Sequence, residues 1–218
     1  MIIAIDGPSG SGKSTLGRML ARQLNLLYID TGSMYRAVAL ATIEAELDPS
    51  DTETIADVAE RADIDLEGDP DSLKVLLNGR EVTEDIRTER VTAMSSVVST
   101  IPGVRRAMVA RQRIMGQRGA VLNGRDIGTV VFPDADIKFF LTAAPEERAE
   151  RRFKEDSLTN ADVSLSQTLS EMIERDRRDS SRADSPLKAA DDAIVIDSSG
   201  LTIDQVFARM MEHVYRHH

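Results

Sequence analysis

The segment Gly7-Pro8-Ser9-Gly10-Ser11-Gly12-Lys13-Ser14-Thr15 follows the apolar run 2–5 after one acidic residue, Asp6, and precedes apolar residues at helical spacing. This order is typical of a strand, a glycine-rich loop and a helix. The segment matches the whole Walker A pattern, Gly-x-x-x-x-Gly-Lys-Ser, in the context that the pattern requires. Backbone N–H groups in such a loop turn inward around phosphate oxygens, and the helix N-terminus adds positive charge. The sequence therefore predicts a triphosphate site at residues 7–15.

The side chains of this segment suit ATP bound together with a metal ion. Lys13 is placed to reach the β- and γ-phosphates, and the hydroxyl of Ser14 is a ligand for Mg²⁺. We therefore expect Mg²⁺ as the cofactor and ATP as a substrate. The residues of this segment expected to bind ATP are Gly7, Pro8, Ser9, Gly10, Ser11, Gly12, Lys13, Ser14 and Thr15.

Two other classes of protein that carry this loop are disfavoured by motifs that the sequence lacks. A GTPase is expected to have an Asn-Lys-x-Asp motif on a late strand, and none occurs. An ATP-driven motor usually has an apolar strand that ends in Asp-Glu, which is also missing, and 218 residues are few for a motor domain. The loop therefore favours a kinase.

Composition limits the compartment and the partners. A chain with 41% hydrophobic residues and no linker predicts a single domain, 1–218, and the lack of cysteine excludes thiolate metal sites. A net charge of −10 argues against nucleic acid as a partner, because such binding requires a basic surface. The sequence has no signal peptide and no apolar run of membrane-spanning length. We expect a cytoplasmic monomer without nucleic-acid or membrane partners.

Short apolar runs alternate with helical stretches along the whole chain. Beyond the first strand, such runs occur at 26–29, 120–122, 137–141 and 193–196. This alternation predicts an α/β fold in three layers, with a five-stranded parallel sheet covered by helices on both faces.

Three helices in the second half have readable start signals. Pro145 indicates a helix at 145–156. Ser164 and Thr202, each followed by glutamine three residues later, predict capping boxes at the starts of helices at 165–181 and 202–216.

The stretch 62–87 has a different pattern. Apolar and polar residues alternate around Gly68-Asp69-Pro70 and around Asn78-Gly79. Asn-Gly between two such runs is a strong hairpin signal. We expect a small antiparallel sheet inserted into the parallel fold.

Ligands of open parallel sheets bind beyond the carboxyl ends of the strands. The second strand is followed by Asp30-Thr31-Gly32-Ser33-Met34-Tyr35-Arg36, and the third by Asn123-Gly124-Arg125-Asp126. Arg36 and Arg125 are therefore expected at the edge that carries the phosphate loop. Two guanidinium groups there would grip the phosphate of an acceptor.

Four segments resemble the bacterial cytidylate kinases, and the resemblance runs from residue 2 to about 215. They are residues 7–15, 30–36, Gly-Arg-Asp-Ile-Gly-Thr-Val-Val-Phe-Pro-Asp-Ala at 124–135, and Glu-Arg-Asp-Arg-Arg-Asp-Ser-Ser-Arg at 174–182. The segment 124–135 is the most specific, because nucleotide kinases in general share only the first. The family usually has serine where Thr31 stands, which retains the hydroxyl and puts the choice between ribose and deoxyribose in question.

The resemblance implies transfer of the γ-phosphate of ATP to CMP or dCMP, giving CDP or dCDP and ADP. It implies a nucleoside monophosphate-binding region at 31–118 and a lid at 145–182, where Arg148, Arg151 and Arg152 would close over ATP. The implied CMP-binding residues are Thr31, Tyr35, Arg36, Ser96, Arg105, Arg125, Asp126, Arg175, Asp179 and Arg182. The implied catalytic residues are Lys13, Arg125, Asp126, Arg175 and Arg182.

In this reading Ser96, Arg105 and Asp126 face the cytosine. Asp126 would accept from the exocyclic amino group and Arg105 would donate to the ring, a pattern that uracil satisfies poorly. Two alternatives remain open from the sequence. One is a kinase of the same fold for UMP, AMP or a small metabolite alcohol, and the other is a nucleotide-binding module without turnover.

Overall fold

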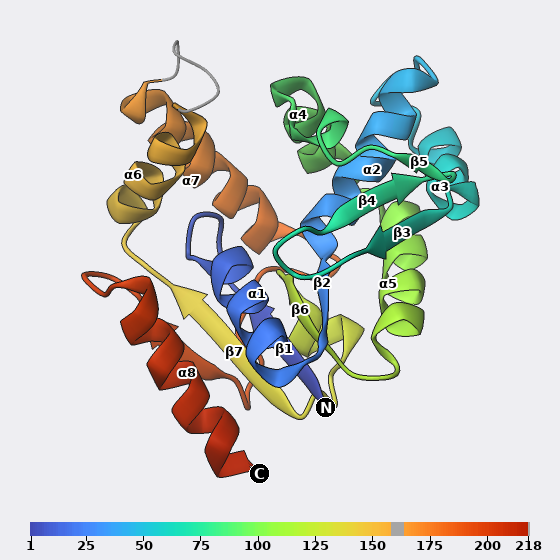
Figure 1. Cartoon of the computed structure of the whole chain (residues 1–218). Coiled ribbons are helices and arrows are strands. Elements are labelled where there is room, and N and C mark those ends of the chain that lie inside the picture. Colours follow the sequence, from blue (N-terminus) through green and yellow to red (C-terminus); the bar gives the residue numbers. More distant parts are fainter. Residues whose placement is uncertain (158–163, 218) are drawn as a thin grey trace.

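The computed structural model of the chain describes residues 1–157 and 164–217. Its centre is a five-stranded parallel sheet in the order β2-β6-β1-β7-β8 (Figure 1). The strands are β1 (Ile2–Asp6), β2 (Leu27–Asp30), β6 (Ala120–Gly124), β7 (Ile137–Thr142) and β8 (Ile194–Asp197). The predicted α/β fold with its five parallel strands is confirmed.

Alternate residues of β1 pack into two separate cores, one on each face of the sheet. Ile3 and Ile5 lie in the core that includes residues of α1 (Lys13–Leu24) and α8 (Ile203–His217). Ala4 lies in the other core, with residues of α2 (Thr31–Glu44) and α5 (Pro102–Gly116). Because successive side chains of a strand point to opposite faces, this alternation produces the three layers.

A second, antiparallel sheet lies in the region between β2 and β6. It consists of β3 (Ile64–Glu67), β4 (Lys74–Leu77) and β5 (Arg80–Glu81). The β4–β5 turn has Asn78 at φ 52° and Gly79 at φ 75°, as a two-residue hairpin of this type requires. The expected inserted sheet at 62–87 is confirmed. The same region contains α3 (Thr52–Arg61), η1 (Asp85–Arg87) and α4 (Glu89–Val98).

Two further helices form a second group at the upper left of Figure 1, across from the insertion at the upper right. They are α6 (Pro145–Asp156) and α7 (Leu165–Ser181), which pack against each other. The predicted lid, 145–182, spans both helices, and its residues 158–163 lie outside the described part of the chain. No helix among residues 1–157 and 164–217 is long and apolar enough to cross a membrane.

The two predicted capping boxes differ in the structure. At Thr202 the box is complete, because its N–H donates to Gln205 Oε1 and its hydroxyl accepts from Gln205 N–H. At Ser164 only the hydroxyl acts as a cap, accepting from Gln167 N–H. The Gln167 amide instead donates to Glu171, one turn further along α7 at 2.9 Å. A competing i, i+4 partner therefore makes the prediction of a full box at Ser164 wrong.

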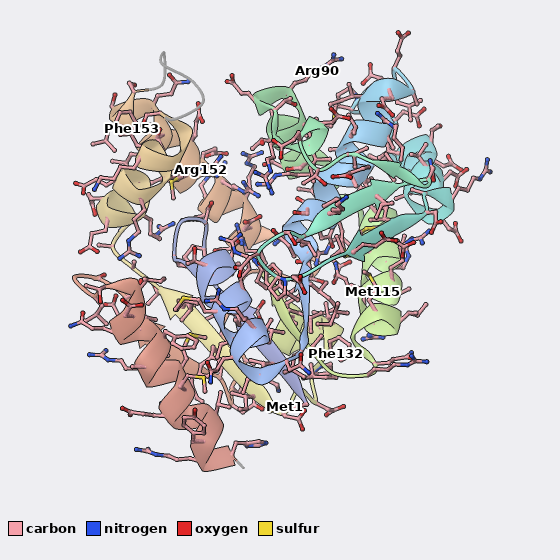
Figure 2. All side chains as sticks on the ribbon, viewed as in Figure 1. Met1, Arg90, Met115, Phe132, Arg152 and Phe153 are labelled. Carbon is pink, nitrogen blue, oxygen red and sulfur yellow. The ribbon has the colours of Figure 1, made fainter. Side chains whose placement is uncertain are left out.

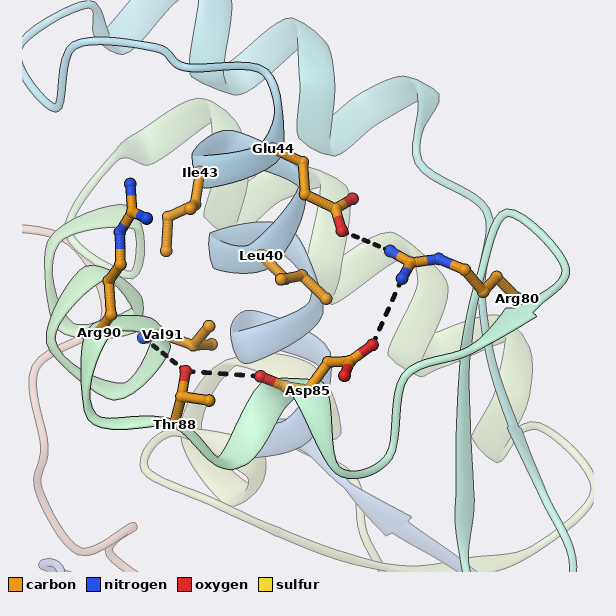
Figure 3. A pocket seen from close by; sticks show the side chains of 8 residues that line it. All are labelled: Leu40, Ile43, Glu44, Arg80, Asp85, Thr88, Arg90 and Val91. Atoms are coloured by element: carbon orange, nitrogen blue, oxygen red, sulfur yellow. Dashed lines mark hydrogen bonds and ion pairs between the residues drawn. The ribbon is translucent and has the colours of Figure 1, made fainter.

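Figure 3 shows a pocket of about 390 Å³ on the inserted region, away from the phosphate loop. Leu40, Ile43 and Val91 line its apolar part. At its rim, Arg80 is paired with both Glu44 and Asp85. The charges at this pocket therefore largely neutralise one another.

Candidate active site

The phosphate loop connects β1 to α1 in a conformation that only glycine permits at its key positions. A Cβ on Gly7 would lie 2.1 Å from the carbonyl oxygen of Leu141 on the neighbouring strand β7. Gly12 has φ 90° and stands immediately before the first residue of α1. The loop is therefore held close to the sheet and leads directly into a helix N-terminus, as an anion site requires.

Lys13 is buried beneath this loop. Its ammonium donates to the carbonyl oxygen of Pro8 and lies 3.4 Å from Ser11 Oγ. Burial, followed by the nearby positive charges of Arg125 and Arg175, lowers the pKa of Lys13 well below its ordinary value. A triphosphate in the loop would supply the negative charge that favours the ammonium form.

Ser14 has a partner that the sequence analysis did not assign. Asn123, at the end of β6, donates from Nδ2 to Ser14 Oγ at 2.9 Å. Asn123 is buried, and its Oδ1 has no hydrogen-bond partner in the described part of the chain. The Ser14 hydroxyl and this free amide oxygen are hard oxygen donors, so the residues present fit a Mg²⁺ ion carried by a nucleotide. The described residues contain no group of three or more His, Asp or Glu that could hold a metal unaided.

A pocket of about 250 Å³ opens beside the phosphate loop. Arg151 of α6 lines it and donates to the hydroxyl and carbonyl oxygens of Ser198, at 3.0 and 2.9 Å. The other lining residues include Gly10, Ser11, Gly12, Thr15, Ser198, Leu201 and Ile203. Leu201 follows β8 and Ile203 begins α8, and sequence analysis missed these two because no charged or motif residue marks the wall.

The three arginines expected from the lid occupy different environments. Arg148 is buried and donates to the backbone of Ser9 and to Asp176, at 2.9 and 2.6 Å. It therefore braces the phosphate loop against α7 instead of standing free to close over a ligand. Arg152 lies on α6 beside α7 (Figure 2) and contributes positive charge near Arg36 and Arg175.

Three guanidinium groups converge beside the loop from different elements. Arg36 comes from α2, Arg125 follows β6, and Arg175 comes from α7. Arg36 and Arg175 make no hydrogen bond or ion pair with other described residues, whereas Arg125 donates to Asp179 at 2.9 Å. Burial and then the charge of Arg125 lower the pKa of Arg175 to about 9, and burial also lowers the pKa of Arg36. Such a cluster, rich in positive charge and poor in partners, fits a phosphate dianion.

A buried ion pair lies next to this cluster. Arg105 of α5 donates to Asp126, and their side chains are only 3% and 8% exposed. The guanidinium carbon of Arg105 is 5.8 Å from the ring centre of Tyr35, and Arg105 Nε has no hydrogen-bond partner in the described residues. Sequence analysis named all three residues but did not predict that the cation and the acid bind each other.

Asp179 contacts both an arginine of the cluster of Arg36, Arg125 and Arg175 and the nearby Arg182. It accepts from Arg125 and lies 3.5 Å from Arg182 at the end of α7. Burial opposes ionisation of Asp179, but Arg125, Arg182 and Arg175 outweigh it and hold its pKa below the ordinary value. Arg182 in turn approaches the carbonyl oxygen of Ser99, which Arg105 also reaches, at 3.4 and 3.3 Å.

Thr31 and Ser96, the two aliphatic hydroxyl residues expected at the acceptor site, come from different helices. Thr31, the first residue of α2, is buried and donates its hydroxyl to the carbonyl oxygen of Asn123 at 2.7 Å. This hydrogen bond links α2 to β6, and the hydroxyl oxygen of Thr31 can still accept a hydrogen bond. Ser96 is half-buried on α4.

Comparisons with known proteins agree with one another. A family model described as cytidylate kinase matches residues 3–216. The chain is 53% identical to a protein named cytidylate kinase from Desulforamulus reducens, over 94% of this chain and 92% of that protein. It is 49% identical to a cytidylate kinase from Syntrophotalea carbinolica, over 98% and 92%. Among solved structures, an uncharacterized protein from Eubacterium ventriosum matches with a TM-score of 0.53 at 13% identity, over 98% of both chains, which concerns the fold alone.

Proposed function

Because the chain belongs to the cytidylate kinase family, we propose that Lys13, Arg125, Asp126, Arg175 and Arg182 carry out the reaction of that family on this scaffold. The protein is a (d)CMP kinase, which transfers the γ-phosphate of ATP to CMP or dCMP. The observation that carries the residue assignment is the convergence of Arg36, Arg125 and Arg175 beside the phosphate loop, next to the buried Arg105–Asp126 pair.

On the donor side, residues 7–15 hold the triphosphate and Arg151 closes the pocket next to them. Lys13 stabilises the charge that spreads over the transferring phosphoryl group. Mg²⁺, held by Ser14 and the phosphates, would neutralise the β- and γ-oxygens. The apolar wall at Leu201 and Ile203 suits the adenine ring.

On the acceptor side no strong general base is needed. The attacking group is a phosphate oxygen that is already ionised near neutral pH, since the second pKa of a phosphomonoester is about 6. Arg36, Arg125 and Arg175 neutralise that dianion and align it with the γ-phosphate. Asp179 keeps Arg125 in place through its hydrogen bond and, with Arg175, is placed to bind the sugar.

At the base, Asp126 accepts from the exocyclic amino group of cytosine, and Arg105 donates to the ring, with Ser96 and Arg182 nearby. Uracil would place a carbonyl oxygen against the Asp126 carboxylate and leave a buried acceptor unpaired. Tyr35 packs under Arg105 and limits the ways the guanidinium can turn. We therefore assign cytosine recognition to the Arg105–Asp126 pair.

The same proposal covers the organisation of the chain. Residues 31–118 would bind the nucleoside monophosphate and residues 145–182 would act as a lid, within one domain, 1–218. Closure between them would expel water from the reacting phosphates. The proposal includes a monomeric protein that acts in the cytoplasm, where its nucleotide substrates occur.

The test is a coupled assay of ADP release with Mg-ATP and each of CMP, dCMP, UMP, AMP and shikimate. We expect rapid turnover with CMP or dCMP and much slower turnover with UMP. Arg105→Met should remove the preference for cytosine while the protein still binds ATP. Equal rates with CMP and UMP in the wild type would refute the base-reading assignment, and turnover with none of the five would refute the substrate.

A further inference from the structure

Asp6 is a buried acid that has no role in the proposed reaction. It is the last residue of β1, only 4% exposed, and it stands immediately before Gly7 of the phosphate loop. Its Oδ1 accepts from the backbone N–H of Ile127 and its Oδ2 from that of Gly128, both at 2.8 Å. One carboxylate therefore connects the start of the phosphate loop to a segment more than 120 residues away in sequence.

The two N–H groups begin a single π-helical turn, η2 (Ile127–Val131). This turn follows directly after Arg125 and Asp126, and the carbonyl oxygen of Asp126 accepts from the N–H groups of Val130 and Val131 at 2.9 and 3.2 Å. The first N–H groups of a helical turn have no partner within the turn and need one outside it. Asp6 is that partner, so its position determines where the turn begins.

The far end of the turn is held by a second side chain. Arg113 of α5 donates to the carbonyl oxygens of Val131 and Val130 at 2.9 and 2.8 Å. π-helical turns are rare and are found frequently at functional sites. The turn that directly follows the acceptor-site arginine and acid is thus held at both ends, and Asp6 holds the end next to Arg125 and Asp126.

We propose that Asp6 is a positioning residue that fixes Arg125 and Asp126 relative to the phosphate loop, so that acceptor recognition is aligned with the bound triphosphate. The register of the sheet supports this, because Asp6 of β1 lies opposite Gly124 of β6, the residue before Arg125. The inference rests on the proposed function of Arg125 and Asp126.

A carboxylate meets a requirement here that no neutral side chain of the same shape can meet. Two adjacent N–H donors need two acceptor oxygens, whereas an asparagine would point its NH₂ group at one of the donors. Space is also limited, because a Cβ on Gly128 would lie 3.4 Å from Asp6 Oδ2 and 3.1 Å from the Lys138 side chain. Burial raises the pKa of Asp6 to about 6 in spite of both hydrogen bonds, so the ionised form is retained at a cost.

The experiment compares Asp6→Asn with the wild type in steady-state kinetics with CMP, UMP and ATP. A displacement of a reacting group by about 1 Å can cost on the order of 100-fold in rate. We expect a loss of about 10- to 100-fold in kcat/KM for CMP, a fall of about 10-fold in the CMP-to-UMP preference, and a KM for ATP within about twofold of the wild type.

Met210→Ala is the matched control for lost stability, since Met210 is fully buried on α8 in the core on the opposite face of the sheet from Ile127 and Val131. It should lower the melting temperature and leave the CMP-to-UMP preference unchanged. If Asp6→Asn fails to fold, Arg113→Met decides, because Arg113 is exposed and clamps the same turn. A reduced preference in that variant supports the positioning role.

An unchanged CMP-to-UMP preference in Asp6→Asn, or in Arg113→Met where the first variant does not fold, would overturn the proposal. So would a rise in the KM for ATP as large as that for CMP, because Asp6 would then act on the phosphate loop alone. Failure of the proposed function gives a different result, namely a wild-type enzyme that does not prefer CMP over UMP.

Discussion

Removing one partner of the Arg105–Asp126 ion pair should destabilise the protein far more than removing both. Arg105→Met would leave the Asp126 carboxylate, with a side chain only 8% exposed, without its cation, and Asp126→Ala would leave the equally buried guanidinium without its anion. Stranding one buried charge costs about 3–5 kcal/mol, whereas replacing a buried pair by apolar groups is often nearly neutral. We therefore expect each single variant to lose about 3–5 kcal/mol in free energy of unfolding.

Urea unfolding of the wild type, both single variants and the double variant provides the measurement. The double variant should lose less than either single variant, so its loss should fall short of the sum of the single losses by more than about 3 kcal/mol. Arg177 and Glu174 on α7 offer a matched control, because their N···O distance is also short, 2.8 Å, but their side chains are 69% and 50% exposed. Their coupling should be much smaller. Strict additivity at Arg105 and Asp126 would refute the argument that the two charges depend on each other.

Three other substitutions test separate parts of the site. Arg125→Ala should lower kcat/KM for CMP far more than the affinity for ATP; equal losses in both would contradict its place at the acceptor phosphate. Gly7→Ala should lower the free energy of unfolding in urea by more than about 3 kcal/mol. The new Cβ would lie 2.1 Å from the Leu141 carbonyl oxygen, and Gly7 has φ 146°, which alanine rarely adopts. A variant as stable as the wild type would refute that contact. Asp6→Asn tests the pKa of Asp6, which burial raises from 3.8 to about 6. As the pH rises, Asp6 loses its proton at a lower pH in the unfolded chain than in the folded protein. The free energy of unfolding of the wild type should therefore fall, relative to that of the variant, by about 2 kcal/mol between pH 4 and 7 in thermal or urea melts. A difference between the two proteins that does not change with pH would contradict this.

The features that sequence analysis predicted are those that short segments determine. Most residues of the parallel strands are apolar, because helices cover both faces of the sheet. The phosphate loop and the Asn78-Gly79 turn depend on glycines within a few residues. The helix starts at Pro145 and Thr202 likewise use neighbours in the chain. Ser164 shows the limit of such signals, because Gln167 has an alternative partner, Glu171, that the same spacing rules allow.

The contacts that sequence analysis did not find join segments far apart in the chain. Asp6 pairs with Ile127, and Ser14 with Asn123, because β1 and β6 are neighbours in the sheet. Arg105 meets Asp126 because α5 packs beside β6 and η2. A polar residue at a strand end is visible in the sequence, but the partner that it meets depends on which strand is adjacent. Arg148 illustrates the same point. The resemblance places it among the lid arginines, but its guanidinium donates to the backbone of Ser9 in the phosphate loop and to Asp176 of α7.

The charge of the site explains why a protein with a net charge of −10 can bind two anionic substrates. Arg36 belongs to residues 31–118, while Arg152 and Arg175 belong to residues 145–182. In addition to burial, the charge of Arg152 lowers the pKa of Arg36, and the charges of Arg36 and Arg152 lower the pKa of Arg175. In the proposed closure, like charges on the two regions would oppose their approach until an anion lies between them. An acceptor phosphate would convert that repulsion into attraction, so closure should be far more favourable with the acceptor bound than with ATP alone. The site would then close, and exclude water from the γ-phosphate, only when an acceptor is present to receive the phosphoryl group.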